Sequence, residues 1–265
     1  MSTSVARIAC VLAVGGLDPG GGAGVLADAR AIARAGAFGC AAVAVLTVQS
    51  TSGLLRATPV ARAELLAECK EVLRHQRVRA IKIGALGNLE NTRAIADLLA
   101  LHRDIPAVVD TVMIPTRGRA RLLEERAVAA MRDLLLPRAA LVTVNAPEAE
   151  VLTGSRVTRL DEARAAARAL VEGGARAVLV KGGHLGGARA VDVFATKGRV
   201  VELAAKRLRL AGVHGGGCTL ASLVAGRIAA EDVSIEDAVR WAKRVHHAAL
   251  ARAADVGGEL RVLVP

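Results

Sequence analysis

The sequence predicts an α/β protein with a mainly parallel central sheet and helices on both faces. Short apolar runs alternate along the chain with longer stretches in which apolar residues recur at helical spacing. The apolar runs show no alternation with polar residues, which is typical of strands buried on both faces. A chain of 265 residues with 53% hydrophobic residues can bury one large core, so we expect a single domain over residues 1–265.

The apolar runs predict strands at Ile8–Val14, Ala41–Val48, Ala80–Ile83, Ala107–Val109, Ala140–Val144 and Ala177–Val180. Helices are expected between them at Val25–Ala35, Pro59–Arg74, Leu89–His102, Glu124–Leu135 and Asp161–Glu172. Gly36 ends the first helix, and Thr58 before Pro59 is suited to start the second. After Lys181 the pattern changes to a hairpin at a sheet edge, followed by two closing helices: Val191–Ala195 with Arg199–Leu203, then Thr219–Ile228 and Ile235–Asp255.

Composition narrows the class of partner. The net charge of +11 raises the question of nucleic acid, but the arginines are scattered beside acidic residues, as on solvated helix faces. With no Tyr, two Phe and one Trp, the chain offers few surfaces on which bases could stack. We therefore expect no nucleic-acid partner, and we expect the charge to attract small anionic substrates.

The cysteines and the apolar runs bear on location. The four cysteines show no C-x-x-C spacing, which favours a reducing, cytoplasmic environment. No apolar run reaches the length of a transmembrane helix, so no membrane association is expected.

Candidate site residues follow the predicted strands directly. They are Gly15–Gly24, Gln49, Gly84, Asp110, Asn145 and Lys181. Parallel sheets bind ligands at the carboxyl ends of their strands, so we expect these residues to meet at one edge. In the first loop, GGLDPGGGAG, glycine permits close approach of the backbone to a flat ligand, and Asp28 is placed to hydrogen-bond that ligand. The alternatives are a mobile turn and an ordinary helix-surface carboxylate.

A second glycine loop, HGGGCT at His214–Thr219, opens directly into an apolar helix. Unpaired N–H groups and the helix dipole favour negative charge at such a terminus, so the loop is suited to bind an anion. The dipole is also expected to lower the pKa of the Cys218 thiol. The alternative is a tight entry turn with a buried cysteine.

Two further strand ends carry polar residues. Asn145 and Glu148 could meet a hydrated Mg²⁺ through water, or they could simply cap a helix start. Lys181, before two glycines, could contact a phosphate or be an ordinary surface charge.

Taken together, these motifs resemble the hydroxymethylpyrimidine and phosphomethylpyrimidine kinases of thiamine biosynthesis, within the ribokinase-like superfamily. The resemblance covers nearly the whole chain, in the segments Gly15–Asp28, Ala35–Gly53, Ile81–Gly87, Val108–Met113, Leu135–Gly154, Val178–His184 and His214–Ser222. It implies a three-layer α/β/α sandwich, commonly a homodimer, that binds ATP with Mg²⁺ and a small pyrimidine.

The resemblance also implies roles for individual residues. The pyrimidine pocket would comprise Gly16, Asp28, Gln49, Ala85 and Val112, in which Gln49 can both donate and accept toward an aminopyrimidine. The nucleotide and magnesium side would comprise Asp110, Asn145, Glu148 and Lys181. Cys218 would take the proton of the substrate hydroxyl, while backbone N–H groups hold the transferring phosphoryl group in an anion hole formed by Gly215, Gly216, Gly217 and Cys218.

Three residues depart from the family pattern. Gly216 replaces a threonine of the usual GTGC, Ala85 replaces the methionine that packs on the pyrimidine, and Arg117 stands where a lysine is usual. These departures leave open a pyridoxal-type kinase on the same scaffold. They also leave open a catalytically weakened pyrimidine-binding or regulatory protein, and the sequence does not decide whether one or both phosphorylation steps are catalysed.

Overall fold

In the part of the chain that the structure describes, the protein folds around one nine-stranded sheet. The structure is a computed structural model that describes residues 7–118, 120–210 and 212–265. The strand order is β3-β2-β1-β4-β5-β6-β7-β8-β9, and β10 and β11 form a separate pair. In the stretch β2-β1-β4-β5-β6-β7 of this order, neighbouring strands run parallel. Strands β3, β8 and β9 run antiparallel to β2, β7 and β8, respectively. The strands span β1 Cys10–Leu17, β2 Phe38–Ser50, β3 Gly53–Pro59, β4 Val78–Ile83, β5 Ala107–Asp110, β6 Leu141–Asn145, β7 Ala177–Lys181, β8 Arg189–Thr196, β9 Arg199–Lys206, β10 Val213–His214 and β11 Arg261–Val262.

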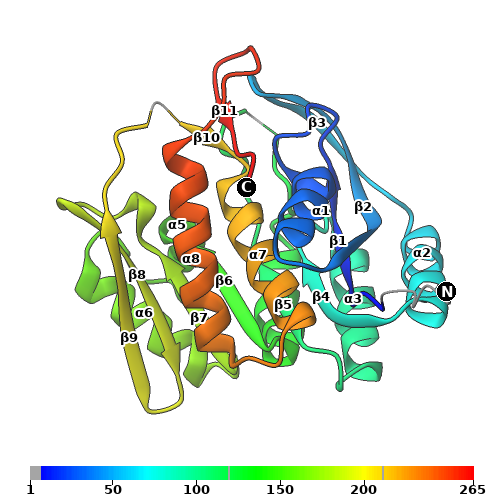
Figure 1. Ribbon diagram of the computed structural model, residues 1–265. Helices are drawn as coiled ribbons and strands as arrows, with labels where there is room; N and C mark the ends of the chain where they lie inside the picture. Colours follow the sequence, from blue (N-terminus) through cyan, green and yellow to red (C-terminus); the bar gives the residue numbers. More distant parts are fainter. Residues whose placement is uncertain (1–6, 119, 211) are drawn as a thin grey trace, which may run out of the picture.

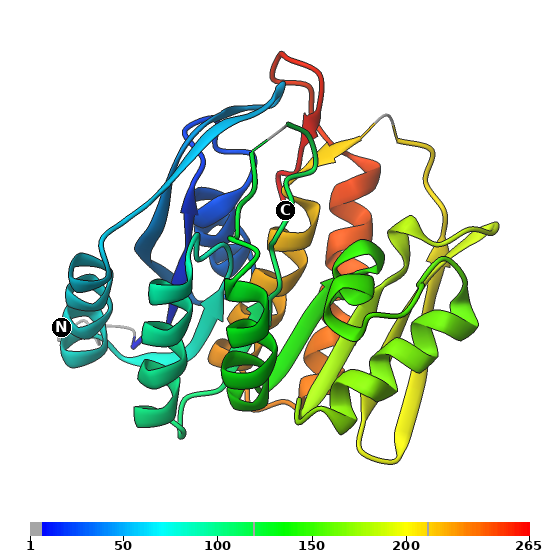
Figure 2. The same cartoon turned by 180° about the vertical axis from the view of Figure 1, so that it is seen from behind.

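Helices cover both faces of the sheet, which confirms the predicted three-layer α/β/α sandwich. Helices α1, α7 and α8 lie on the face seen in Figure 1, and α2 to α6 lie on the face seen in Figure 2. The α-helices span α1 Gly24–Arg34, α2 Arg62–His75, α3 Leu89–Leu101, α4 Ala127–Ala130, α5 Ala146–Thr153, α6 Leu160–Glu172, α7 Gly216–Ala230 and α8 Ile235–Ala251. Within the described ranges, no helix combines the length and the apolar character needed to cross a membrane.

The pleat of the strands divides the core into two layers. Along β1, Leu12 and Val14 pack toward α2 and α3, whereas Val11 and Ala13 pack toward α1 and α7. Because both faces are covered, consecutive residues are buried, which is why the sequence shows uninterrupted apolar runs.

Two of the helices predicted for the face seen in Figure 2 differ from the structure. Gly53–Pro59 forms β3, paired with β2, so Pro59 ends a strand and the following helix begins only at Arg62. The predicted helix at Glu124–Leu135 is α-helical only over Ala127–Ala130, and a π-helical turn follows at Met131–Leu135. Pro137 explains the change, because proline lacks the N–H that would continue the helix and its ring crowds the carbonyl one turn earlier. The predicted hairpin is confirmed as β8 and β9, with β9 at the sheet edge.

Candidate active site

The strand ends open into a cavity of about 700 Å³ between the sheet and the start of α7. Loops after β1, β4, β5, β6 and β7 contribute to its wall, together with Thr47 and Gln49 near the end of β2, as expected for a parallel sheet. The cavity brings together the residues singled out from the sequence: Gly16, Asp28, Gln49, Ala85, Val112, Asp110, Asn145, Glu148, Lys181, Gly215, Gly216, Gly217 and Cys218.

One end of the cavity is lined by small residues. A Cβ added at Gly16 would lie 3.8 Å from both Ala85 Cβ and Thr47 Cγ2, which is ordinary van der Waals contact, so these residues are close neighbours in the wall. Gln49 projects from the end of β2, and its amide nitrogen lies 3.2 Å from Nε2 of His214. This end therefore combines small residues along its wall with the polar side chains of Gln49 and His214.

Asp28 has a partner that was not predicted from the sequence. Its side chain is fully buried, and its two oxygens accept hydrogen bonds from Lys82 Nζ at 2.9 and 2.8 Å. The Ser222 hydroxyl on α7 donates a third at 2.8 Å. Burial alone would lower the pKa of Lys82, but the Asp28 carboxylate, together with Asp110 and the nearby Cys218, outweighs burial and raises that pKa. Asp28 is thus half of a buried ion pair at the wall of the cavity, which rules out the alternative of an ordinary helix-surface carboxylate, and its contact with a ligand remains a prediction.

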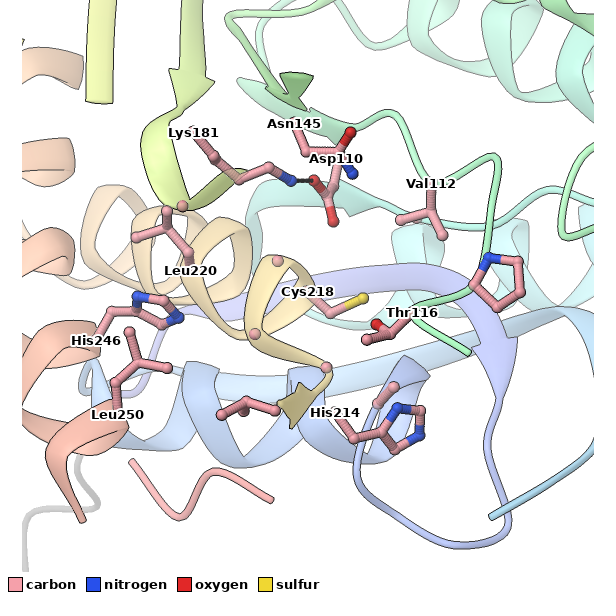
Figure 3. A pocket seen from close by; sticks show the side chains of 18 of the residues that line it. Asp110, Val112, Thr116, Asn145, Lys181, His214, Cys218, Leu220, His246 and Leu250 are labelled. Atoms are coloured by element: carbon pink, nitrogen blue, oxygen red, sulfur yellow. Dashed lines mark hydrogen bonds and ion pairs between the residues drawn. The ribbon is translucent and has the colours of Figure 1, made fainter. Parts of the chain in front are cut away.

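A second ion pair, Lys181–Asp110, lies at the far side of the cavity (Figure 3). Lys181 Nζ donates to Asp110 Oδ1 at 2.7 Å, and the Thr143 hydroxyl donates to the same oxygen at 2.7 Å. Burial opposes ionisation of Asp110, but Lys181 and Lys82 outweigh it and lower its pKa. Lys181 is mostly buried, so it is not an ordinary surface charge.

The two carboxylate oxygens of Asp110 differ in their contacts. Among the described residues, Oδ2 of this buried carboxylate has no hydrogen-bond partner. A Cβ added at Gly217, in the first turn of α7, would lie 3.5 Å from that oxygen and 3.0 Å from Lys181 Nζ. The free oxygen thus faces the start of α7, where it can bind a cation, a water molecule or a hydroxyl group.

Asn145 and Glu148 form a capping box at the start of α5. Glu148 N donates to Asn145 Oδ1 at 2.9 Å, and Asn145 N donates to Glu148 Oε2 at 3.1 Å. The Thr111 hydroxyl also donates to Glu148 Oε2, at 3.1 Å. Burial raises the pKa of Glu148 despite the attraction of Lys181. The capping alternative is therefore confirmed, and a contact with hydrated Mg²⁺ remains a prediction.

The residues present fit a magnesium ion that is held largely by water and substrate oxygens. In residues 7–118, 120–210 and 212–265, no three His, Cys, Asp or Glu side chains gather as a ready-made metal site. The unpartnered Asp110 oxygen is a hard anionic donor of the kind that Mg²⁺ prefers, and Mg²⁺ commonly binds through few carboxylates plus substrate phosphates.

The anion-binding end of α7 is built from glycine. The helix begins at Gly216 rather than at the predicted Thr219, so the glycines form its cap and first turn. Gly215 adopts a φ of +73°, and an added Cβ would collide with the carbonyl oxygen of Gly22. Only glycine therefore fits at this cap, and the first N–H groups of α7 border the cavity without intrahelical partners.

Cys218 points into the cavity from this first turn, between Asp110 and His214 in Figure 3. Its thiol is not activated as the sequence predicted. Burial raises the pKa of Cys218 to about 12, and the carboxylates of Asp28 and Asp110 oppose the lowering by Lys82. The predicted effect of the helix dipole on this pKa is thus outweighed.

Three further residues of the site were missed. Asp18 and His214 lie 2.8 Å apart and are both buried, and Lys82 lies under the cavity. A lysine inside the apolar run of β4 was a visible signal, whereas the pairing of Asp18 with His214 was not. Arg117, expected near phosphate, instead pairs with Glu259 at the surface.

Comparisons with known proteins give a consistent family. A family model described as phosphomethylpyrimidine kinase matches residues 18–263. The hydroxymethylpyrimidine/phosphomethylpyrimidine kinase of Rhizobium meliloti is 40% identical over 247 residues, which cover 92% of this chain and 91% of that protein. The enzyme of the same name from Escherichia coli is 34% identical over 243 residues, which cover 91% of each.

Solved structures share the fold. A phosphomethylpyrimidine kinase from Clostridium difficile is 29% identical, with a TM-score of 0.79, covering 92% of this chain and all of that one. A pyridoxal kinase from Bacillus subtilis, solved with ADP, gives a TM-score of 0.88 at 23% identity and 97% coverage of both chains. At that identity, the second likeness concerns the fold alone.

Proposed function

The chain belongs to the phosphomethylpyrimidine kinase family, and from this premise we propose that it transfers the γ-phosphoryl group of ATP to 4-amino-5-hydroxymethyl-2-methylpyrimidine, to its monophosphate, or to both. The observation that carries this proposal is the juxtaposition of a buried acidic and basic pair, Asp110 and Lys181, with the glycine-rich start of α7. One cavity thus combines a cation, a free carboxylate oxygen and unpaired N–H groups, which suits phosphoryl transfer.

In the proposed reaction, the substrate hydroxyl oxygen attacks the γ-phosphorus of ATP. A new oxygen–phosphorus bond forms, the bond between the γ-phosphorus and the bridging oxygen of ADP breaks, and the hydroxyl proton passes to the thiolate form of Cys218. Lys181 and the N–H groups of Gly216 to Cys218 stabilise the charge on the transferring group. Because such transfer has a loose transition state, the protein mainly positions the reactants and neutralises charge.

Magnesium would be held by Asp110 Oδ2, with Asn145 and Glu148 contributing through water. When bound, it would supply positive charge that neutralises the phosphate oxygens. Lys181 holds the other Asp110 oxygen at 2.7 Å, so the free oxygen keeps a fixed direction toward the cavity.

The state of Cys218 shapes the expected pH dependence. With a pKa raised to about 12, the thiol is protonated near neutral pH, and only a small fraction is thiolate. If the thiolate accepts the substrate proton, activity increases with pH over the neutral range.

We propose that the pyrimidine lies at the end of the cavity formed by Gly16, Ala85 and Val112, with Gln49 as its polar contact. Ala85 leaves more room than the methionine usual at this position in the family, because its side chain is a single methyl group. This room favours pyridoxal as the second candidate substrate.

We also propose that each chain is a single kinase domain and that two chains form a homodimer in the cytoplasm. The ribbon of β2 and β3 exposes Leu46, Val48 and Leu55, of which Leu55 is 80% exposed, and a second copy would cover them. The four cysteines are free, as suits a reducing compartment. Sedimentation of wild type and of Leu55→Glu tests the dimer, because a monomeric wild type would refute it.

The function is tested by ATP consumption with Mg²⁺ in the presence of hydroxymethylpyrimidine, its monophosphate or pyridoxal. Turnover with either pyrimidine supports the proposal and identifies the step. Turnover with pyridoxal alone reassigns the substrate but keeps the reaction. Saturable pyrimidine binding without any turnover identifies a weakened binding protein and refutes the kinase proposal.

A further inference from the structure

His214 lies between two polar residues at the pyrimidine end of the cavity. Its Nε2 is 2.8 Å from Asp18 Oδ2 and 3.2 Å from the amide nitrogen of Gln49. Asp18 and His214 are 2% and 4% exposed, so water does not compete effectively for either group. A single ring nitrogen thus meets a carboxylate on one side and an amide on the other.

The position of the imidazole proton follows from these contacts. The Asp18 carboxylate also accepts hydrogen bonds from the N–H groups of Gly20 and Ala23, at 2.9 and 2.8 Å. Burial opposes ionisation of Asp18, but His214 and these N–H groups outweigh it and lower its pKa. An ionised carboxylate oxygen 2.8 Å from Nε2 requires a proton on that nitrogen, because two lone pairs would otherwise repel each other.

The other ring nitrogen supports the same assignment. Within the described ranges, Nδ1 of His214 is buried and has no hydrogen-bond partner. Placing the only proton of a neutral imidazole there would leave an unsatisfied buried donor and remove the bond to Asp18. Nε2 therefore carries a proton and acts as a donor.

This assignment determines the orientation of the Gln49 amide. A donor Nε2 cannot accept from an amide NH₂ group. After a half turn about the last side-chain torsion of Gln49, however, its one proton can be shared between Asp18 Oδ2 and the amide oxygen in a three-centre hydrogen bond. We propose that the Asp18–His214 pair holds Gln49 with its oxygen toward His214 and its NH₂ group toward the cavity. Asp18 and His214 are then positioning residues that select a heterocycle with a hydrogen-bond acceptor, such as a ring nitrogen, at that point. The second lone pair of the amide oxygen can accept from an adjacent exocyclic amine.

A glycine at position 22 leaves space for the His214 ring. Gly22 is close to the His214 ring, and a Cβ added there would overlap the imidazole. Asp18 belongs to the loop after β1, whereas His214 precedes the first turn of α7. The pair therefore joins the two glycine loops on either side of the cavity, so the amide is oriented by the same contact that places the anion-binding turn.

The proton assignment is tested on the intact wild-type protein by NMR of ¹⁵N-labelled histidine. We expect the His214 signal, assigned by its loss in His214→Phe, to show a proton on Nε2. An unprotonated Nε2 would overturn the inference. This measurement needs no substrate, so it stands even if the proposed kinase function, on which the substrate selection rests, fails in the turnover assay.

The orientation of the amide is tested by Gln49→Glu, which keeps the size of the side chain and its acceptor toward His214 but has no NH₂ group. We expect kcat/KM for the pyrimidine to fall about a hundredfold, while KM for ATP and the melting temperature stay near wild type. An unchanged kcat/KM would contradict the inference. It would indicate that the Gln49 amide offers its oxygen, and not its NH₂ group, to the cavity, because Gln49→Glu then removes no donor from the cavity.

His214→Phe tests the positioning role. We expect KM for the pyrimidine to increase about tenfold with KM for ATP unchanged, because Gln49 becomes free to rotate. If His214→Phe fails to fold, Asp18→Asn gives the second measurement, with the same increase in KM and with less protonation of Nε2. Equal changes in both KM values would indicate a purely structural role and would overturn the proposal.

Discussion

Removing Lys82 should destabilise the protein by about 4 kcal/mol, because it leaves the Asp28 carboxylate buried with an unbalanced charge. The two side chains are 1% and 0% exposed and are joined by hydrogen bonds of 2.8 and 2.9 Å. After Lys82→Met, only the Ser222 hydroxyl would remain, among the described residues, as a side-chain donor to Asp28. For a chain of this length, such a loss lowers the melting temperature by about 10 °C.

The reasoning is checked by thermal and urea unfolding of Lys82→Met, with Lys70→Met on the exposed face of α2 as the matched control. The double variant Lys82→Met with Asp28→Asn removes both charges, so we expect it to recover about 2 kcal/mol. A double variant no more stable than Lys82→Met would refute the assignment of the loss to an unpaired charge.

The loss should also depend on pH in a defined direction. Without Lys82, burial holds the pKa of Asp28 above its value in the unfolded chain, which is about 4. The penalty is therefore present above about pH 4, where unfolding allows the carboxyl to ionise, and it disappears below that pH. A difference between wild type and Lys82→Met that stays constant down to about pH 3 would contradict this account.

Three further outcomes are expected at the cavity. Because the pKa of the Cys218 thiol is raised to about 12, kcat/KM should increase about tenfold per pH unit over the neutral range. Activity assays across pH should show no such increase for Cys218→Ala. A wild-type kcat/KM that does not change with pH would place the proton acceptor elsewhere. Gly215→Ala should lose at least about 2 kcal/mol in urea unfolding, whereas Gly183→Ala, with open space around it, should be near neutral; equal losses would refute the steric argument. Asp110→Asn should lower kcat about a hundredfold with little change in circular dichroism, and retained turnover would exclude a role for its free oxygen.

Much of the fold was predictable because the central strands are buried on both faces. Continuous apolar runs revealed β1, β4, β6 and β7 close to their observed ends. β3 escaped because an exposed strand such as Gly53–Pro59 has little apolar signal, and Pro59 resembled a helix start. The register between β2 and β3, rather than local propensity, decides that segment.

The candidate site was predictable as a set of strand-end residues, since parallel strands deliver their carboxyl ends to one edge. What could not be predicted was which polar groups satisfy one another. Asn145 and Glu148 meet within α5, so their capping box depends on local spacing and was foreseen as an alternative. Asp28 on α1 meets Lys82 on β4, and that pairing depends on how α1 packs over the sheet.

The sequence by itself determined the order of strands and helices, the glycine loops and the family, because these depend on local pattern and on motifs read along the chain. Only the tertiary structure decided the electrostatic state of the site. Whether Cys218 is a thiolate, which Asp110 oxygen is free, and what His214 contacts all depend on burial and on charges brought from distant segments. Desolvation and charge pairing act over a few ångströms in space, and the spacing of residues along the chain does not contain those distances.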